Sequence, residues 1–155
     1  MDSESDYANE TVNQEHFHKL EHMYLHTPIN SFYKPTILVS AGSTEICIPI
    51  RSDFFHAAFA VHGSVYFKAM DDAAFFACNS LITGFFVLTV TFNIYFLRPV
   101  SHGEIRAFGR VIHHSNRLLV ADSILTDSDG LEIGRGSGSF MPSKIPLTPE
   151  MGYFY

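Results

Sequence analysis

The sequence predicts an α+β fold in which a curved antiparallel β-sheet wraps around one central apolar helix. The helix is predicted between Val61 and Ser80, where apolar residues surround two adjacent acids, Asp71 and Asp72. The sheet is predicted from the residues that follow, because four segments of alternating apolar residues are separated by turn sequences. Strands joined by short turns pair antiparallel, and their apolar face is buried most simply against the helix.

The remaining elements are expected in a regular order along the chain. Residues 1–11 are acidic and without periodicity, which predicts a disordered tail. An additional helix is expected at about residues 12–26, and Ser64 is expected to be the N-cap of the central helix. At 155 residues, the chain is expected to form one domain over residues 12–155. The strands are expected at residues 44–51, 86–97, 105–113, 118–126 and 131–140.

Composition argues against several classes of partner. The net charge is −6 and no segment concentrates Lys or Arg, so neither a nucleic acid nor an anionic membrane is an expected partner. The longest apolar run, Phe85 to Val90, is far shorter than the roughly 20 residues that span a bilayer. The N-terminal residues do not resemble a secretory signal. Cys47 and Cys78 read as buried thiols of a reducing compartment, so a cytoplasmic location is expected.

Three histidines on the N-terminal helix raise the question of a metal site. His18, His22 and His26 are spaced by four residues and would lie along one face of a helix. Two imidazoles one turn apart can share a zinc ion, but no acid or cysteine stands at a convincing fourth position. We therefore expect an ordinary polar helix face and no metal.

Three interpretations of Asp71 and Asp72 remain open on the residues alone. One or both acids could pair with an arginine such as Arg98 or Arg110. Alternatively, one could be a general base or nucleophile whose pKa is raised by its apolar surroundings. A divalent metal bound by both is disfavoured, because neighbouring helix positions diverge by about 100°.

The spacing between Gly63 and Asp71 constrains a catalytic interpretation. Eight residues of helix span roughly 12 Å, which is too far for both groups to contact one carbonyl group. If the Gly63 N–H polarises a carbonyl and Asp71 attacks it or activates water, the two groups must come from different chains. A catalytic role for both therefore predicts a site between two subunits.

Three segments carry a resemblance to a known family: HGSVYFKAMDDAAFFACNS, LTVTFNIYFLRPVSHGEIRAFGRV and DSDGLEIGRGSGSF. Over residues 44–142 the sequence resembles the PaaI-like hotdog-fold acyl-CoA thioesterases of phenylacetate-pathway type. The resemblance implies a hotdog fold, to which this chain adds an N-terminal helix. It also implies a homodimer or homotetramer with active sites between subunits.

The resemblance assigns catalytic roles to four positions. Gly63 matches the glycine whose backbone N–H binds the thioester carbonyl, and Asp71, not Asp72, matches the catalytic carboxylate. His56 occupies the place where an asparagine commonly orients the thioester or the water. Thr89 matches a hydroxyl residue that assists the water in some members of the family.

Four further residues are candidates for substrate binding. His62 and Ser64 flank Gly63, although His62 is as well explained as a cap or a packing residue. Arg98 could bind a CoA phosphate, but an arginine at a strand end is more often a surface ion pair. Thr91 is expected on the same strand face as Thr89, where both would line the site or form an ordinary polar face.

The expected function is hydrolysis of an acyl-CoA thioester to the free acid and CoA. No cofactor or metal is expected, because a thiolate leaves readily and the barrier is met by positioning and electrostatics. Two alternatives stay open at this point. One is a non-catalytic acyl-CoA binding module, and the other is a hotdog thioester hydratase or dehydratase that pairs His56 with Asp71.

Overall fold

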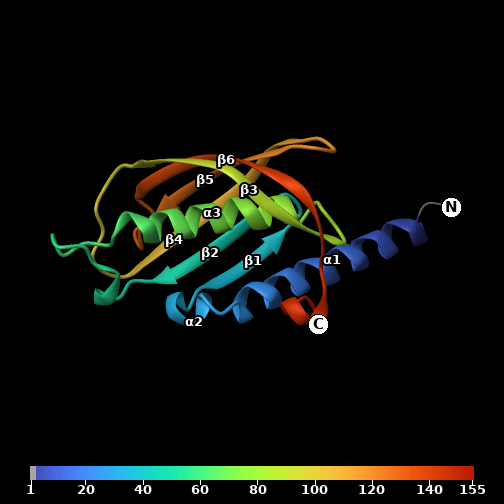
Figure 1. Ribbon diagram of the computed structural model, residues 1–155, viewed down its shortest axis with the longest axis horizontal. Coiled ribbons are helices and arrows are strands. Elements are labelled where there is room, and N and C mark those ends of the chain that lie inside the picture. The colour runs from blue at the N-terminus through green and yellow to red at the C-terminus, as the bar shows by residue number, and fades with distance from the viewer. Residues whose placement is uncertain (1–2) are drawn as a thin grey trace.

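A six-stranded antiparallel sheet curves around helix α3 (Figure 1). The computed structural model describes the backbone of residues 3–155 and the side chains of residues 13–155. The predicted α+β hotdog architecture with an extra N-terminal helix is confirmed. The helices are α1 (Ser3–His26), α2 (Asn30–Tyr33) and α3 (Gly63–Asn79), with 3-10 turns at Ser52–Phe54 and Pro149–Met151. The strands are β1 (Thr36–Ser40), β2 (Ser43–Pro49), β3 (Phe85–Phe96), β4 (Glu104–His114), β5 (Leu119–Thr126) and β6 (Glu132–Pro146).

The order of strands in the sheet is β1-β2-β4-β5-β6-β3. Strands β4, β5 and β6 form the predicted meander, but β3 pairs with β6 and not with β4, so it lies at one edge. The sequence does not reveal this order, because periodicity identifies strands and not their partners. Strand β1 was missed, since its five residues are too few to establish an alternating pattern.

Helix α3 packs into the sheet through small residues. Ala69, Ala73 and Ala77 are fully buried, and strand β4 approaches the helix most closely at Gly109. A Cβ atom on Gly109 would lie 2.1 Å from the carbonyl oxygen of Ala73. Only glycine permits this approach, because a backbone carbonyl inside a helix cannot move aside.

The alternating glycines of β6 create room for an aromatic ring. Gly136 and Gly138 face the interior, and their Cβ positions would lie 2.7 Å and 2.4 Å from the ring of Phe92. The ring of Phe92 therefore rests against bare backbone. The GRGSGSF sequence noted in the resemblance thus has a packing explanation in this chain.

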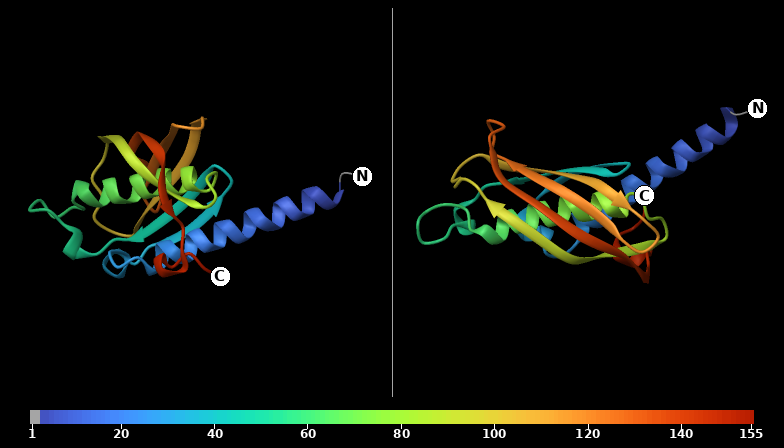
Figure 2. Two further views of the ribbon diagram at one scale, coloured as in Figure 1. Left: turned by 45° about the vertical axis from the view of Figure 1, so that its right-hand side comes forward. Right: turned by 90° about the horizontal axis from the view of Figure 1, so that it is seen from above.

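Helix α1 lies beside β1 and the C-terminal segment (Figure 2). It buries the predicted stripe of Phe17, Leu20 and Tyr24. The helix begins at Ser3, so residues 3–11, predicted as a disordered tail, continue the helix instead, and Met1 and Asp2 lie outside the described residues. Extension of an existing helix costs far less than its nucleation. The assignment of residues 12–155 to one domain stays a prediction.

Over the part of the chain that the structure describes, no helix combines the length and the apolar character that crossing a membrane requires.

The contact between α3 and β4 makes Gly109 a sensitive position. Gly109→Ala is expected to lower the free energy of unfolding by about 2 kcal/mol or more, because the helix must move away from the sheet. Urea denaturation followed by circular dichroism measures this change. The neighbouring exposed position serves as the control, and Arg110→Ala is expected to change stability by less than about 0.5 kcal/mol. Equal effects of the two substitutions would contradict the proposed close contact.

Candidate active site

The N-terminus of α3 is capped by His62. Nδ1 of His62 accepts a hydrogen bond from the Ser64 N–H at 3.0 Å, and the Ser64 hydroxyl lies 2.8 Å from the same nitrogen. Ser64, predicted as the N-cap, is therefore inside the first turn, because the extended backbone of His62 lets its ring reach the amide. Gly63 is the first helical residue, and its N–H has no acceptor within the helix.

A first cavity of about 330 Å³ opens at this end of α3. Gly63, His56 and Arg98 all line it. Nδ1 of His56 accepts a hydrogen bond from the Ala58 N–H at 3.1 Å, so neutral His56 carries its proton on Nε2. The Tyr66 hydroxyl donates to the backbone carbonyl of Arg98 at 2.7 Å. The first cavity thus combines a free helix amide with a histidine that can donate.

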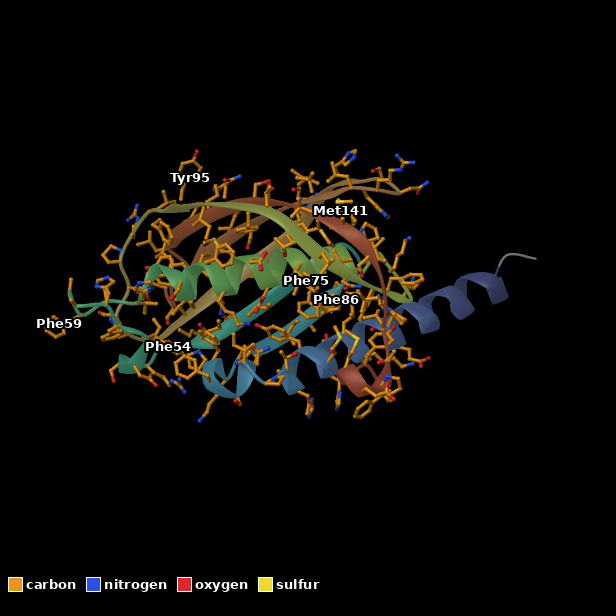
Figure 3. All side chains as sticks on the ribbon, viewed as in Figure 1. Phe54, Phe59, Phe75, Phe86, Tyr95 and Met141 are labelled. Carbon is orange, nitrogen blue, oxygen red and sulfur yellow. The ribbon has the colours of Figure 1, made fainter. Side chains whose placement is uncertain are left out.

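A second cavity of about 480 Å³ lies halfway along α3, between this helix, β3, α1 and α2. Asp71 and Thr89 line it together with a largely apolar wall. Phe75 and Phe86 belong to that wall, and their ring centroids are 5.1 Å apart (Figure 3). The C-terminal segment contributes Met151. Such a lining suits an apolar ligand group that extends along the cavity as far as the Asp71 carboxylate.

Asp71 has the electrostatic character of a base. Its Oδ1 accepts a hydrogen bond from the Thr89 hydroxyl at 3.0 Å. Burial raises the pKa of Asp71 to about 6, an effect that the Thr89 hydrogen bond and nearby Lys68 partly oppose and the charge of Asp72 reinforces. A carboxylate with this pKa is ionised at neutral pH and yet binds a proton more readily than an ordinary aspartate.

Asp72 is held in an ion pair. The Lys68 ammonium binds Oδ2 of Asp72 one helical turn away, and the Tyr24 hydroxyl donates to the same oxygen at 2.8 Å. Burial raises the pKa of Asp72, while both partners favour its ionised form. The structural interpretation thus holds for Asp72, with Lys68 as its partner in place of the arginines considered above. The spacing of four residues between Lys68 and Asp72 is a signal that the sequence already contained.

Thr91 does not share the strand face of Thr89. A β-bulge shifts the register between them, so Thr89 stands opposite Phe140 and Thr91 opposite Ser139. The Thr91 hydroxyl lies 2.7 Å from the Ser139 hydroxyl and lines neither cavity. The prediction of one shared face was wrong, because a bulge reverses the alternation that a regular strand would keep.

The predicted site residues therefore divide into two groups within one chain. Gly63, His56 and Arg98 meet in the first cavity, whereas Asp71 and Thr89 meet in the second. Gly63 and Asp71 lie eight residues apart on an uninterrupted helix, which corresponds to roughly 12 Å. Within one chain, the Gly63 N–H and the Asp71 carboxylate therefore cannot contact the same carbonyl group.

The histidines of α1 make hydrogen bonds. His22 Nδ1 donates to the Gly152 carbonyl at 2.7 Å and His26 Nδ1 to the His22 carbonyl at 2.8 Å, while His18 pairs with Glu21. Among the residues whose side chains are described, no group of three or more His, Cys, Asp or Glu is arranged to hold a metal ion.

The raised pKa of Asp71 predicts that its charge destabilises the fold. Between its ordinary pKa of 3.8 and about 6, the folded state binds more protons than the unfolded state, so stability falls as the pH rises through this window. Asp71→Asn is therefore expected to raise the free energy of unfolding by about 1–2 kcal/mol at pH 7.5 and to have no such benefit near pH 4. Chemical denaturation at both pH values tests this.

Lys68→Met provides the contrast, because it leaves two adjacent carboxylates without a cation. This substitution is expected to destabilise the fold by about 2–3 kcal/mol at pH 7.5. A loss of stability in Asp71→Asn at pH 7.5 would show that the Asp71 carboxylate is stabilising and would contradict the prediction.

Comparison with known proteins agrees with the fold and the resemblance. The family model described as "Thioesterase superfamily" matches residues 60–133. A search of curated protein sequences gave no match. Among solved structures, the E. coli PaaI protein from the phenylacetic acid degradation operon has a TM-score of 0.80 and 20% identity, over 88% of this chain and 99% of its own.

Two further structures have the same architecture. A thioesterase family protein from Silicibacter pomeroyi has a TM-score of 0.75 and 22% identity, over 80% of this chain and 95% of its own. A putative esterase from Mycobacterium tuberculosis has a TM-score of 0.71 and 20% identity, over 79% of this chain and 100% of its own. The predicted resemblance is therefore confirmed: residues 60–133 match the thioesterase-superfamily model, and the chain has the hotdog fold also found in the PaaI protein.

Proposed function

We propose that this protein is a thioesterase that hydrolyses an acyl-CoA to the free acid and CoA at a site shared by two subunits. The observation that carries the proposal is Asp71, a partly buried carboxylate with a pKa of about 6 in the wall of a largely apolar cavity. It lies on the helix whose first turn presents the free Gly63 amide to the first cavity. The thioesterase-superfamily match over residues 60–133 supports the same class of reaction.

The proposed reaction uses Asp71 either as a general base or as a nucleophile. As a base, the carboxylate takes a proton from water while the water oxygen bonds to the thioester carbon, and the Thr89 hydroxyl orients the carboxylate. The C–S bond then breaks, and the proton on Asp71 passes to the departing thiolate. As a nucleophile, Asp71 bonds to the thioester carbon, the C–S bond breaks to release the thiolate, and water hydrolyses the resulting anhydride to the acid and free Asp71. Both routes give one carboxylic acid and one thiol.

The Gly63 amide is proposed to stabilise the negative oxygen that forms during the reaction. Its N–H is unpaired within the helix and lies at the positive end of the α3 dipole. A donor placed where charge develops contributes about 3 kcal/mol to lowering a barrier of this kind. His56 Nε2 and Arg98 line the same cavity, and we propose them for orienting the thioester and for binding a CoA phosphate.

The edge strand β3 supports the proposal that two chains build each site. Among the strands that the structure describes, β3 pairs with β6 alone and its other edge is open, and the strand carries exposed apolar residues, among them Val90, Tyr95 and Phe96. Such an edge favours pairing with a second strand. Thr89 in the first half of β3 lines the second cavity, whereas Phe96 at its end lines the first. Antiparallel pairing of two β3 strands about a two-fold axis would bring the two cavities of opposite chains together.

The hydrogen bond at His56 Nδ1 favours hydrolysis of a thioester over its hydration or dehydration. A dehydratase needs a histidine and an acid in one site, and His56 Nδ1 is already engaged by the Ala58 amide.

The proposed location is the cytoplasm, where Cys47 and Cys78 would remain as the free thiols observed.

Asp71→Asn is expected to lower kcat on acyl-CoA esters by about 100-fold or more, equivalent to roughly 2.7 kcal/mol. The loss follows because an amide neither accepts a proton from water nor attacks the thioester. Thiol release from a panel of acyl-CoA esters measures it, and kcat/KM of the parent is expected to rise with pH around a midpoint of about 6.

Thr91→Val is the matched control, since Thr91 is a β3 threonine outside both cavities, and its activity is expected to stay near that of the parent. Full turnover by Asp71→Asn would refute the assignment of Asp71. Saturable binding of CoA esters without release by the parent protein would replace the hydrolase with a binding module.

A mixing experiment tests the shared site. Gly63→Pro removes the amide hydrogen at the first helical position, where proline is tolerated, and Phe96→Ala in the same chain removes the ring that would lie 2.8 Å from the new Cβ. This chain and Asp71→Asn should each be inactive alone. When they are co-refolded, about half of the dimers are mixed and have one intact site, so about a quarter of parental activity is expected.

Phe96→Ala alone is the reference for the mixing experiment, and the recovered activity is compared with a quarter of the activity of this variant. No recovery after mixing, with subunit exchange verified by native mass spectrometry, would place a complete site in each chain.

A further inference from the structure

The second cavity contains a charged pair for which the proposed reaction has no direct use. Lys68 and Asp72 form an ion pair although their side chains are only 12% and 19% exposed. Tyr24 on α1 donates a hydrogen bond to the Asp72 carboxylate at 2.8 Å. The ammonium group of Lys68 also lies 5.0 Å from the ring centroid of Tyr24 and 5.3 Å from that of Tyr33. Three helices thus hold the pair in one arrangement.

Stability alone does not explain this ion pair. Desolvation of two charges commonly offsets their attraction, and apolar residues of similar size would often be at least as stable. The position of the pair points to a different role. Lys68 precedes Asp71 by three residues, a spacing that makes these two residues neighbours on the helix surface. Asp72 lines the same cavity as Asp71 and Lys68.

We propose that Lys68 and Asp72 are positioning residues that place one positive and one negative charge beside Asp71 and thereby fix the pH range in which Asp71 holds its proton. The inference rests on the proposed function, since it assigns the pair a role in tuning the base of that reaction. The Tyr24 hydroxyl on α1 donates a hydrogen bond to Asp72 but adds no charge beside Asp71.

The surroundings of Asp71 contain few other groups that could supply this effect. Among the described residues that line the cavity, Asp72 raises the pKa of Asp71 and Lys68 lowers it. Burial raises the pKa of the Tyr24 hydroxyl on α1, which keeps that group neutral. The β3 strand contributes the neutral hydroxyl of Thr89, and α2 and the C-terminal segment contribute Asn30 and Met151.

The two charges predict shifts of opposite sign. Asp72→Asn removes the negative neighbour and leaves the ammonium, so the midpoint of Asp71 titration is expected to fall by about half a pH unit or more. Lys68→Gln removes the positive neighbour, so the midpoint is expected to rise by a similar amount. In the double variant both charges are absent, and the midpoint should return close to that of the parent.

The measurement is the carboxyl ¹³C NMR titration of Asp71 in the intact protein, with the signal assigned by its absence in Asp71→Asn. The pH dependence of kcat/KM provides a second readout and should move in the same direction. Tyr24→Phe is the control for packing, because it removes the hydroxyl but keeps both charges, and its midpoint should stay within about 0.2 pH units of the parent. Lys68→Arg keeps the charge and should also titrate like the parent.

Opposite shifts in Asp72→Asn and Lys68→Gln, with Tyr24→Phe unchanged, support the inference. Shifts of the same sign, or a shift in Tyr24→Phe as large as in the charge variants, overturn it and assign the pair to packing. If Lys68→Gln does not fold, Asp72→Asn and Tyr24→Phe decide alone. Absence of thioester hydrolysis by the parent would refute the proposed function, whereas the NMR titration would still decide whether the pair tunes Asp71.

Discussion

Helix α3 packs so closely against the sheet that its position is fixed. At Gly109 the strand backbone contacts the carbonyl of Ala73 directly, and the alanines at 69, 73 and 77 are fully buried against the sheet. A helix fixed in this way has its remaining faces fixed as well. The free amide of Gly63 is held at one end, and the carboxylate of Asp71 is held against β3. The positions of both groups therefore depend on this packing.

The same packing places Asp71 and Asp72 in a cavity with apolar walls, and the two carboxylates have different partners. Asp72 receives an ammonium and a hydroxyl, which offset much of the cost of burying its charge. Asp71 receives only the hydroxyl of Thr89, and its pKa stays raised to about 6. A carboxylate with little neutralisation is unfavourable for folding and useful for proton transfer. The contrast between neighbouring residues is the strongest physical reason to regard Asp71 as the functional one.

The sequence predicted the helices and strands that have a local periodic pattern. Period 3.6 identified α3, and period 2 identified five of the six strands, while the interval from Gly63 to Asp71 indicated that these groups could not meet within one chain. Long-range pairing was not accessible in this way. The edge position of β3 and the bulge beside Thr89 depend on hydrogen bonds to β6, about 50 residues away. The Tyr24–Asp72 hydrogen bond joins residues 48 positions apart and leaves no periodic signal, whereas the Lys68–Asp72 spacing was visible and was overlooked.

Different parts of the chain supply the candidate reacting groups and much of the wall of the second cavity. Gly63, Asp71 and Thr89 all lie within residues 60–133, the region that matches the thioesterase superfamily. Much of the apolar wall lies outside that region, in α1, in α2 and at Met151. Helix α1 is held against the core at three points, where His16 hydrogen-bonds the Asn79 carbonyl, Glu21 accepts the Val39 N–H and Tyr24 bonds Asp72. A wall anchored this firmly has a defined shape. The matched region therefore supplies the groups of the proposed reaction, whereas the flanking elements complete the wall that a ligand in the second cavity would contact.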